Sequence, residues 1–154
     1  MKYMGTLLAV RDMEKSKRFY CELLGLKVVG DFGANISLSG GLFLQTAVTW
    51  KEFIRRDEIV FRNDASELYF ETDDMDDFIK KLEDFGSVDY VHPAVEQPWG
   101  QRAVRFYDPD GHIVEVGEKL KIVMQRFVNS GLSVAETAMR MGVPEEYVRA
   151  ELDS

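Results

Sequence analysis

Cysteine is nearly absent from this chain, which has Cys21 alone among its 154 residues. An intrachain disulfide is therefore excluded. Cys21 falls in a predicted helix beside Phe19 and Tyr20, and no neighbouring residue is placed to lower the pKa of its thiol. We interpret it as a core or boundary thiol rather than a nucleophile.

The chain also lacks a long apolar run and an excess of positive charge. No stretch approaches the length of a membrane span, and the opening residues do not resemble a signal peptide. The 27 Asp and Glu outnumber the 19 Lys and Arg, and the net charge of −8 disfavours binding to nucleic acid or anionic membranes. The hydrophobic fraction of 45% is enough for a core, so we expect a soluble, cytoplasmic protein.

One order of predicted elements occurs twice. A short strand, a helix and three strands separated by glycines or turns fill about 3–47, and the same order returns in 67–117. The linker, 48–66, reads as a short helix and a loop. One such unit has a half-covered sheet and no complete core, so the two units are expected to pack together.

The last strand of the repeat raises a question of charge. It follows the tetrapeptide Asp108-Pro109-Asp110-Gly111, which suits a type I turn with its glycine in a left-handed conformation. Within that strand Glu115 stands between Val114 and Val116. An unpartnered buried carboxylate is costly, so Glu115 is solvated, paired, or binding something.

Residues 119–154 form a separate helical tail in this interpretation. Gly131 and Gly142 end its first two helices, and Ser133 with Glu136 forms a capping box. The stretch LSVAETAMRMGVPEEYV resembles a helix-turn-helix, but 118–154 carries five basic and six acidic residues, net −1, which disfavours phosphate contact. We expect the tail to cover a sheet edge, close a cavity or add to a dimer contact.

Two motifs at opposite ends of residues 1–118 identify a resemblance. V-x-D-M-E-K-S-x-x-F-Y-x-x-L-L-G near the start and F-Y-D-P-D-G-x-x-x-E-V near the end are similar to those of the vicinal oxygen chelate superfamily. Its members include glyoxalase I, bleomycin-resistance proteins and extradiol dioxygenases. The resemblance implies an α+β fold, in which two βαβββ modules form a cupped mixed sheet, here followed by a tri-helical appendage.

The resemblance also implies four ligand positions, one on each of four strands. Carried over, they fall on Gly5, Gln45, Glu67 and Glu115. The glycine has no ligand atom, and neither histidine of the chain occupies a metal position. The other three offer oxygen, which suits Mg²⁺, Mn²⁺ or Ca²⁺ better than Zn²⁺. We therefore consider a divalent metal held by Gln45, Glu67 and Glu115, with the two carboxylates as catalytic groups.

A site without metal is the alternative. Arg105 precedes the turn on the neighbouring strand and can pair with Glu115 or Glu67, which would satisfy the carboxylate. Arg105, Arg102, Trp99 and Tyr69 are the candidate substrate-binding residues, although a core position is the simpler interpretation of Tyr69.

Two functions follow from the resemblance. The first is a glyoxalase-like enzyme, a lyase or isomerase acting on a polar or carbonyl-containing small molecule, with or without a metal. The second is a non-catalytic protein that binds a drug or metabolite, as bleomycin-resistance members do. A homodimer is expected in either case.

Overall fold

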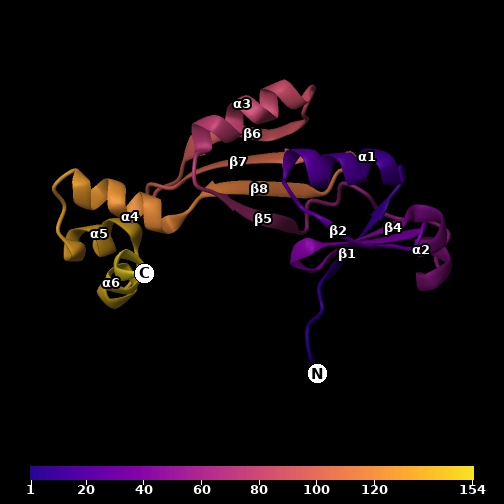
Figure 1. Cartoon of the computed structure of the whole chain (residues 1–154), viewed down its shortest axis with the longest axis horizontal. Coiled ribbons are helices and arrows are strands. Elements are labelled where there is room, and N and C mark those ends of the chain that lie inside the picture. Colours follow the sequence, from indigo (N-terminus) through magenta and orange to yellow (C-terminus); the bar gives the residue numbers. More distant parts are fainter. The chain divides into compact units, whose positions relative to one another are not determined.

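The computed structural model describes all 154 residues, which divide into two compact units. Unit 1 comprises Met1–Glu67, Ser87–Asp89 and Tyr107–Ile113, and unit 2 comprises Leu68–Gly86, Tyr90–Phe106 and Val114–Ser154. Each unit is described by itself below. The order of elements agrees with the predicted α+β class, because two four-stranded sheets each carry their own helix (Figure 1).

Unit 1 is built on a mixed sheet with the strand order β1-β4-β3-β2. The strands are β1 Thr6–Val10, β2 Val28–Asp31, β3 Asn35–Leu38 and β4 Leu42–Thr46. β1 pairs with β4 in parallel, and the other pairs are antiparallel. A short 3-10 turn, η2 Ser39–Gly41, joins β3 to β4, and helix α2 Ala47–Ile54 follows in the predicted linker.

The helix of unit 1 begins where its cap predicts. The Asp12 side chain accepts a hydrogen bond from the Lys15 amide at 3.1 Å, and α1 Met13–Arg18 starts there. The chain then continues as a π-helical turn, η1 Phe19–Leu23, which the sequence pattern did not indicate. Gly25, at φ 74°, takes the left-handed conformation that ends the segment. Phe19, Tyr20 and Leu23 are buried in the core.

The two aspartates of the Asp-Pro-Asp-Gly turn are buried and accept hydrogen bonds from α1 and η1, although they lie nearly a hundred residues further along the chain. The Tyr20 hydroxyl donates to Asp108 at 2.7 Å, and the Ser16 hydroxyl donates to Asp110 at 3.2 Å. Burial alone would raise the pKa of Asp108, but hydrogen bonds from His112 and Tyr20 outweigh it and lower that pKa. The two sequence motifs that carried the resemblance therefore contact each other within unit 1.

Unit 2 repeats the arrangement with the strand order β5-β8-β7-β6. The strands are β5 Glu67–Thr72, β6 Tyr90–Glu96, β7 Arg102–Tyr107 and β8 Ile113–Glu118. Helix α3, Met75–Phe85, lies along the sheet (Figure 1), and Asp74 caps it through the amide of Asp77. Phe78 of α3 packs on Phe106 of β7 with ring centroids 6.3 Å apart. One face of this sheet is therefore the apolar face covered by α3.

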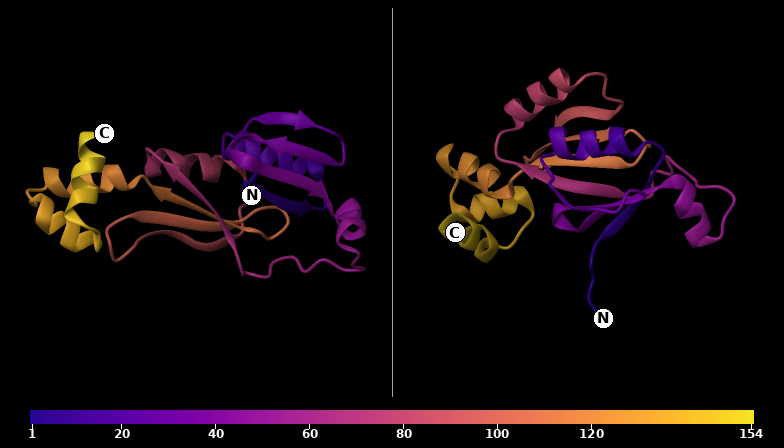
Figure 2. Two further views of the ribbon diagram at one scale, coloured as in Figure 1. Left: turned by 90° about the horizontal axis from the view of Figure 1, so that it is seen from below. Right: turned by 45° about the vertical axis from the view of Figure 1, so that its right-hand side comes forward.

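The tail forms three helices as predicted: α4 Leu120–Asn129, α5 Val134–Met141 and α6 Glu145–Asp153. They gather into a cluster at the C-terminal end of the chain (Figure 2). The capping box of Ser133 and Glu136 is present, and Gly142 ends α5 at φ 69°. Val123, Met124, Ala138, Met141 and Val148 form a small apolar core of their own. No helix of the structure is long and apolar enough to cross a bilayer.

Candidate functional site

The face of the second sheet turned away from α3 carries polar side chains, and we call it the polar face. Strand alternation produces it, because Phe106 points to α3 and its neighbour Arg105 points the other way. On β8, Val114 and Val116 flank Glu115, which is only 5% exposed and pairs with Arg105. The buried carboxylate predicted from the sequence therefore lies on the polar face.

Arg105 is the centre of the polar face. Its guanidinium forms an ion pair with the Glu115 carboxylate, as the metal-free interpretation expected. On its other side, Arg105 Nη1 lies 3.3 Å from Nε2 of His92. His92 is the register partner of Arg105 across the β6–β7 pair, so the contact follows from strand pairing.

The hydrogen bonds of His92 determine its tautomer. Nδ1 lies 2.8 Å from the carbonyl oxygen of Pro93, which can only accept, so Nδ1 carries the proton. Nε2 then presents its lone pair to Arg105, which can only donate. In this arrangement His92 and the Glu115 carboxylate contact the Arg105 guanidinium from two sides.

Aromatic and amide side chains extend the polar face from Glu115. The Gln101 amide nitrogen donates to the Tyr69 hydroxyl at 3.1 Å, and the Gln101 oxygen accepts from the Trp99 indole at 2.9 Å. Tyr69 in turn donates to Glu71 at 3.0 Å. Desolvation, together with Glu71, raises the pKa of Tyr69 to about 12, so its phenol stays protonated and acts as a donor.

Tyr69 and Trp99 are both accessible on this face. Half of Tyr69 is exposed, in contrast to the simpler expectation of a core position, and Trp99 is 38% exposed. Their exposed aromatic surface is available to a ligand.

Arg102 is placed elsewhere by the same strand alternation. It bonds the Glu118 carboxylate at 2.9 Å and Asp76 of α3 at 2.7 Å, so it lies on the α3 side of the sheet. Glu118 is 4% exposed and also accepts from Arg126. Burial would raise the pKa of Glu118, but the bonds from Arg126 and Arg102 lower it. Arg102 is therefore not grouped with Arg105 and Glu115.

Gln45 belongs to unit 1, where it is buried in a polar cluster. Its side-chain oxygen accepts from the Asn35 amide at 2.9 Å, and its nitrogen donates to Thr49. The oxygen proposed as a metal ligand thus has a protein donor. Glu67 is the exposed first residue of β5 and ends the first segment of unit 1, Met1–Glu67.

The first ligand position, Gly5, cannot hold a side chain in this fold. Gly5 has φ 145°, and a Cβ built on it would lie 1.8 Å from the carbonyl oxygen of Gly41. The close approach of these two backbone segments explains why the first strand offers no ligand.

The donor chemistry does not fit a divalent cation. The Glu115 carboxylate forms an ion pair with the Arg105 guanidinium. Because the guanidinium is positively charged, it would repel a metal ion at the same carboxylate. No group of three or more His, Cys, Asp or Glu side chains that could hold a metal is present. The three-ligand set stays a prediction, and no step below uses a metal.

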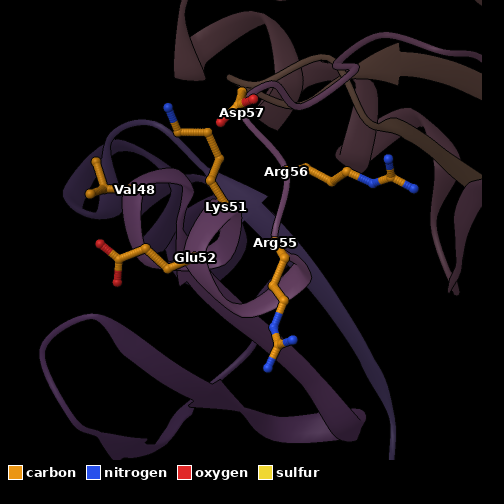
Figure 3. A pocket seen from close by; sticks show the side chains of 6 residues that line it. All are labelled: Val48, Lys51, Glu52, Arg55, Arg56 and Asp57. Atoms are coloured by element: carbon orange, nitrogen blue, oxygen red, sulfur yellow. The ribbon is translucent and has the colours of Figure 1, made fainter.

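A hollow lies in unit 1 beside α2 (Figure 3). It has a volume of about 390 Å³ and is largely open to solvent. Its lining side chains are Val48, Lys51, Glu52, Arg55, Arg56 and Asp57. The charged groups of both signs project in different directions rather than converging on one point. This hollow therefore has no shared binding geometry.

Two residues of the polar face were missed by sequence reasoning. His92 stands beside a proline in β6, where the pairing register shifts on both sides of it, so alternation did not predict its direction. Gln101 precedes β7, and its side chain makes three hydrogen bonds that no sequence motif indicates. The one available signal was the polar character of both residues within the predicted strands.

Comparison with known proteins gives a consistent result. Residues 3–121 match the family model described as a glyoxalase-like domain. A protein of unknown function from Agrobacterium tumefaciens is 37% identical, with a TM-score of 0.69, over 77% of this chain and 94% of the other. No curated protein matches the chain.

Two further solved structures have names that mention an enzyme. A glyoxalase-related enzyme from Fulvimarina pelagi is 23% identical, with a TM-score of 0.67, over 77% of this chain and 88% of its own. Lactoylglutathione lyase from Agrobacterium tumefaciens is 26% identical, with a TM-score of 0.58, over 77% and 94%.

Proposed function

Because the chain belongs to the glyoxalase-like domain family, within the vicinal oxygen chelate superfamily, we propose that its polar face binds and converts a compact polar organic molecule. The observation that carries this proposal is the Arg105–Glu115 ion pair, with His92 on its other side. A carboxylate as buried as that of Glu115, paired with an arginine, is costly to maintain, which is typical of a site rather than of a structural core.

The proposed roles follow from the chemistry of the groups. A guanidinium binds a carboxylate or carbonyl oxygen through a planar pair of N–H donors, so Arg105 orients the ligand. Trp99 and Tyr69 supply an aromatic wall to the site, while the single O–H of Tyr69 is donated to Glu71.

Glu115 is the proposed proton-transfer group. Its carboxylate takes the proton from a carbon next to the substrate carbonyl and returns it to the neighbouring atom. This step is an isomerisation, in which no group leaves and no oxidant is needed. The similarity to a lactoylglutathione lyase, at 26% identity, supports the same class of reaction.

Ligand screening tests the proposal. We expect 2-hydroxy acids or aldehyde–thiol adducts to raise the melting temperature of the protein, and Arg105→Met to abolish the shift. Arg149→Met is the matched control, because Arg149 lies in an exposed pair with Glu145 on α6. A shift that survives in Arg105→Met would overturn the assignment of the site.

A second candidate, non-catalytic binding of a cationic drug or metabolite, is favoured by one observation. The half-exposed Tyr69 ring lies beside the Glu71 carboxylate, and an aromatic face with a carboxylate suits a cation. Cationic antibiotics in the same screen, with Tyr69→Leu as the variant, distinguish it from the enzyme. Binding without turnover of any stabilising compound would favour this candidate.

The expected homodimer is part of the proposal for either function. Analytical ultracentrifugation at several concentrations measures it directly, and a monomer at all concentrations would remove it.

A further inference from the structure

The helical tail contacts a loop that borders the polar face. We call residues 97–101 the rim loop, since it joins β6 to β7 and carries Trp99. Two backbone bonds close it, from Gln97 to the Gln101 carbonyl and from Gly100 to the Gln97 carbonyl, both at 2.8 Å. The family match ends at residue 121, so most of α4 lies beyond the part of the chain that the family shares.

Arg126 of α4 links the rim loop to the end of β8. Its Nη2 donates to the carbonyl oxygen of Gly100, and its Nη1 donates to both oxygens of Glu118 at 2.9 and 3.1 Å. Glu118 is buried, so this is a charge-assisted contact shielded from water on one side.

Phe127 fixes the same loop by packing. Gly100 is buried with φ 88°, and a Cβ placed on it would lie 2.2 Å from the Phe127 ring. The ring therefore occupies the space that any other side chain at position 100 would need. Phe127 also packs on the apolar core of the tail, which connects the loop to the whole three-helix cluster.

Gln101 connects the rim loop to the aromatic side chains of the polar face by hydrogen bonds. Its amide nitrogen donates to the Glu118 carbonyl at 2.7 Å and to the Tyr69 hydroxyl at 3.1 Å. Its oxygen accepts from the Trp99 indole. The two aromatic side chains of the polar face are thus bonded to the loop that α4 holds.

We propose that the C-terminal tail positions the aromatic rim of the site, with Arg126 and Phe127 acting on Gly100 as positioning residues. The tail is then a working part of the site rather than an independent appendage. The term "site" rests on the proposed function, but the mechanical link between α4 and Trp99 does not.

Trp99 fluorescence tests the link without any ligand. The chain has two tryptophans, so Trp50→Phe leaves Trp99 as the single reporter. In that background Arg126→Lys keeps the charge beside Glu118 but cannot serve Glu118 and Gly100 together. We expect a red shift of Trp99 emission and stronger acrylamide quenching, with the far-ultraviolet circular dichroism unchanged.

Arg149→Lys on α6 is the matched control and is expected to leave Trp99 emission unchanged, because Arg149 contacts only Glu145 among the ion pairs. A second test uses Gly100→Ala, which should perturb Trp99 strongly, and less so when Phe127→Ala removes the overlapping ring. Partial rescue in this double variant supports a direct contact.

Unchanged Trp99 emission and quenching in both Arg126→Lys and Gly100→Ala would overturn the proposal. If Gly100→Ala changed Trp99 emission equally with and without the Phe127→Ala substitution, Phe127 would not be a positioning residue. Because no ligand is used, either failure leaves the proposed function standing, and a failed ligand screen leaves the role of the tail standing.

Discussion

At the scale of single residues, Arg105 determines the character of the polar face. The Glu115 carboxylate forms an ion pair with Arg105 and His92 accepts a hydrogen bond from it, so the guanidinium is held from two sides. A preorganised guanidinium loses little conformational entropy when a ligand oxygen binds. The same pair accounts for the presence of a buried carboxylate on β8 without any metal ion.

Gly5 gives a residue-scale prediction. Gly5→Ala should lower the free energy of unfolding by about 3 kcal/mol, because the new Cβ would overlap the Gly41 carbonyl oxygen. Gly33→Ala is the control, since Gly33 has φ 75° but no atom near its Cβ position, and should cost about 1 kcal/mol. Urea unfolding measures both. Equal losses would show that backbone conformation alone matters at Gly5.

At the scale of elements, the contact between the Asp-Pro-Asp-Gly turn and α1 joins segments nearly a hundred residues apart. Asp108 accepts from Tyr20 and from the backbone and side chain of His112, and Asp110 accepts from Arg11 and Ser16. Both carboxylates are buried, so their hydrogen bonds are shielded from water.

The lowered pKa of Asp108 predicts that the folded protein loses stability in acid. Its folded pKa is lowered, so the stability that it contributes is present above the ordinary carboxyl pKa of about 4 and is lost as the pH falls toward the folded value. Asp108→Asn should be about 2 kcal/mol less stable at pH 7, with a shallower loss of stability below pH 5. Unfolding measured from about pH 3 to 7 checks this.

The exposed Glu52 supplies the control for that series. Glu52→Gln should follow the wild-type curve, because Glu52 lies at the surface of α2. If Asp108→Asn also kept the wild-type slope in acid, the turn would not be the source of the acid sensitivity.

Thr137 gives an element-scale prediction for the tail. Its hydroxyl is buried within α5 and has no hydrogen-bond partner. Thr137→Val replaces the hydroxyl with a methyl of similar size and should raise the free energy of unfolding by about 1 kcal/mol. Urea unfolding monitored by circular dichroism measures the change. A loss of stability would show that the hydroxyl has an unrecognised partner.

Much of the element order could be predicted because local signals and tertiary structure agree. Asp12, Asp74 and Ser133 all cap the helices that their positions indicate. The π-helical turn at Phe19–Leu23 could not be predicted, because its side chains have ordinary helical spacing. Tyr20 in this turn donates to Asp108, a tertiary contact that helical spacing does not reveal.

Site residues could be predicted where side chains alternate regularly between the two faces of a strand, and could not where a register shift interrupts that alternation. Arg105 and Glu115 lie on regular strands, and their pairing was one of the two interpretations drawn from the sequence. Arg102 faces α3 because it is an odd number of positions from Arg105, a consequence of strand period that the motif alone did not resolve. His92 lies where the register of β6 shifts, so its direction depends on the sheet.

At the scale of the whole molecule, the chain combines a family domain with a tail that the family model does not include. The match covers residues 3–121, and the tail has its own apolar core. The two parts meet in unit 2 through Glu118, Arg126 and the rim loop. The position of these contacts predicts a local rather than a global effect of removing the tail.

Hydrogen exchange tests that prediction. A chain shortened to residues 1–119 should show faster amide exchange throughout the rim loop, Gln101 included, because Arg126 and Phe127 are missing. Exchange in the Asp-Pro-Asp-Gly turn should be unchanged, since its contacts lie in unit 1. Faster exchange throughout the chain would mean that the tail supports global stability instead.

The central claim is that the Arg105–Glu115 pair marks the ligand site, and nuclear magnetic resonance tests it most directly. A compound that stabilises the protein is titrated into isotope-labelled chain while the Arg105 guanidinium and the backbone amides of His92 and Glu115 are followed. We predict concentration-dependent shifts at these three residues, with none around Arg55 in the hollow beside α2. Shifts that leave Arg105 and Glu115 unmoved while the ligand binds elsewhere would contradict the account.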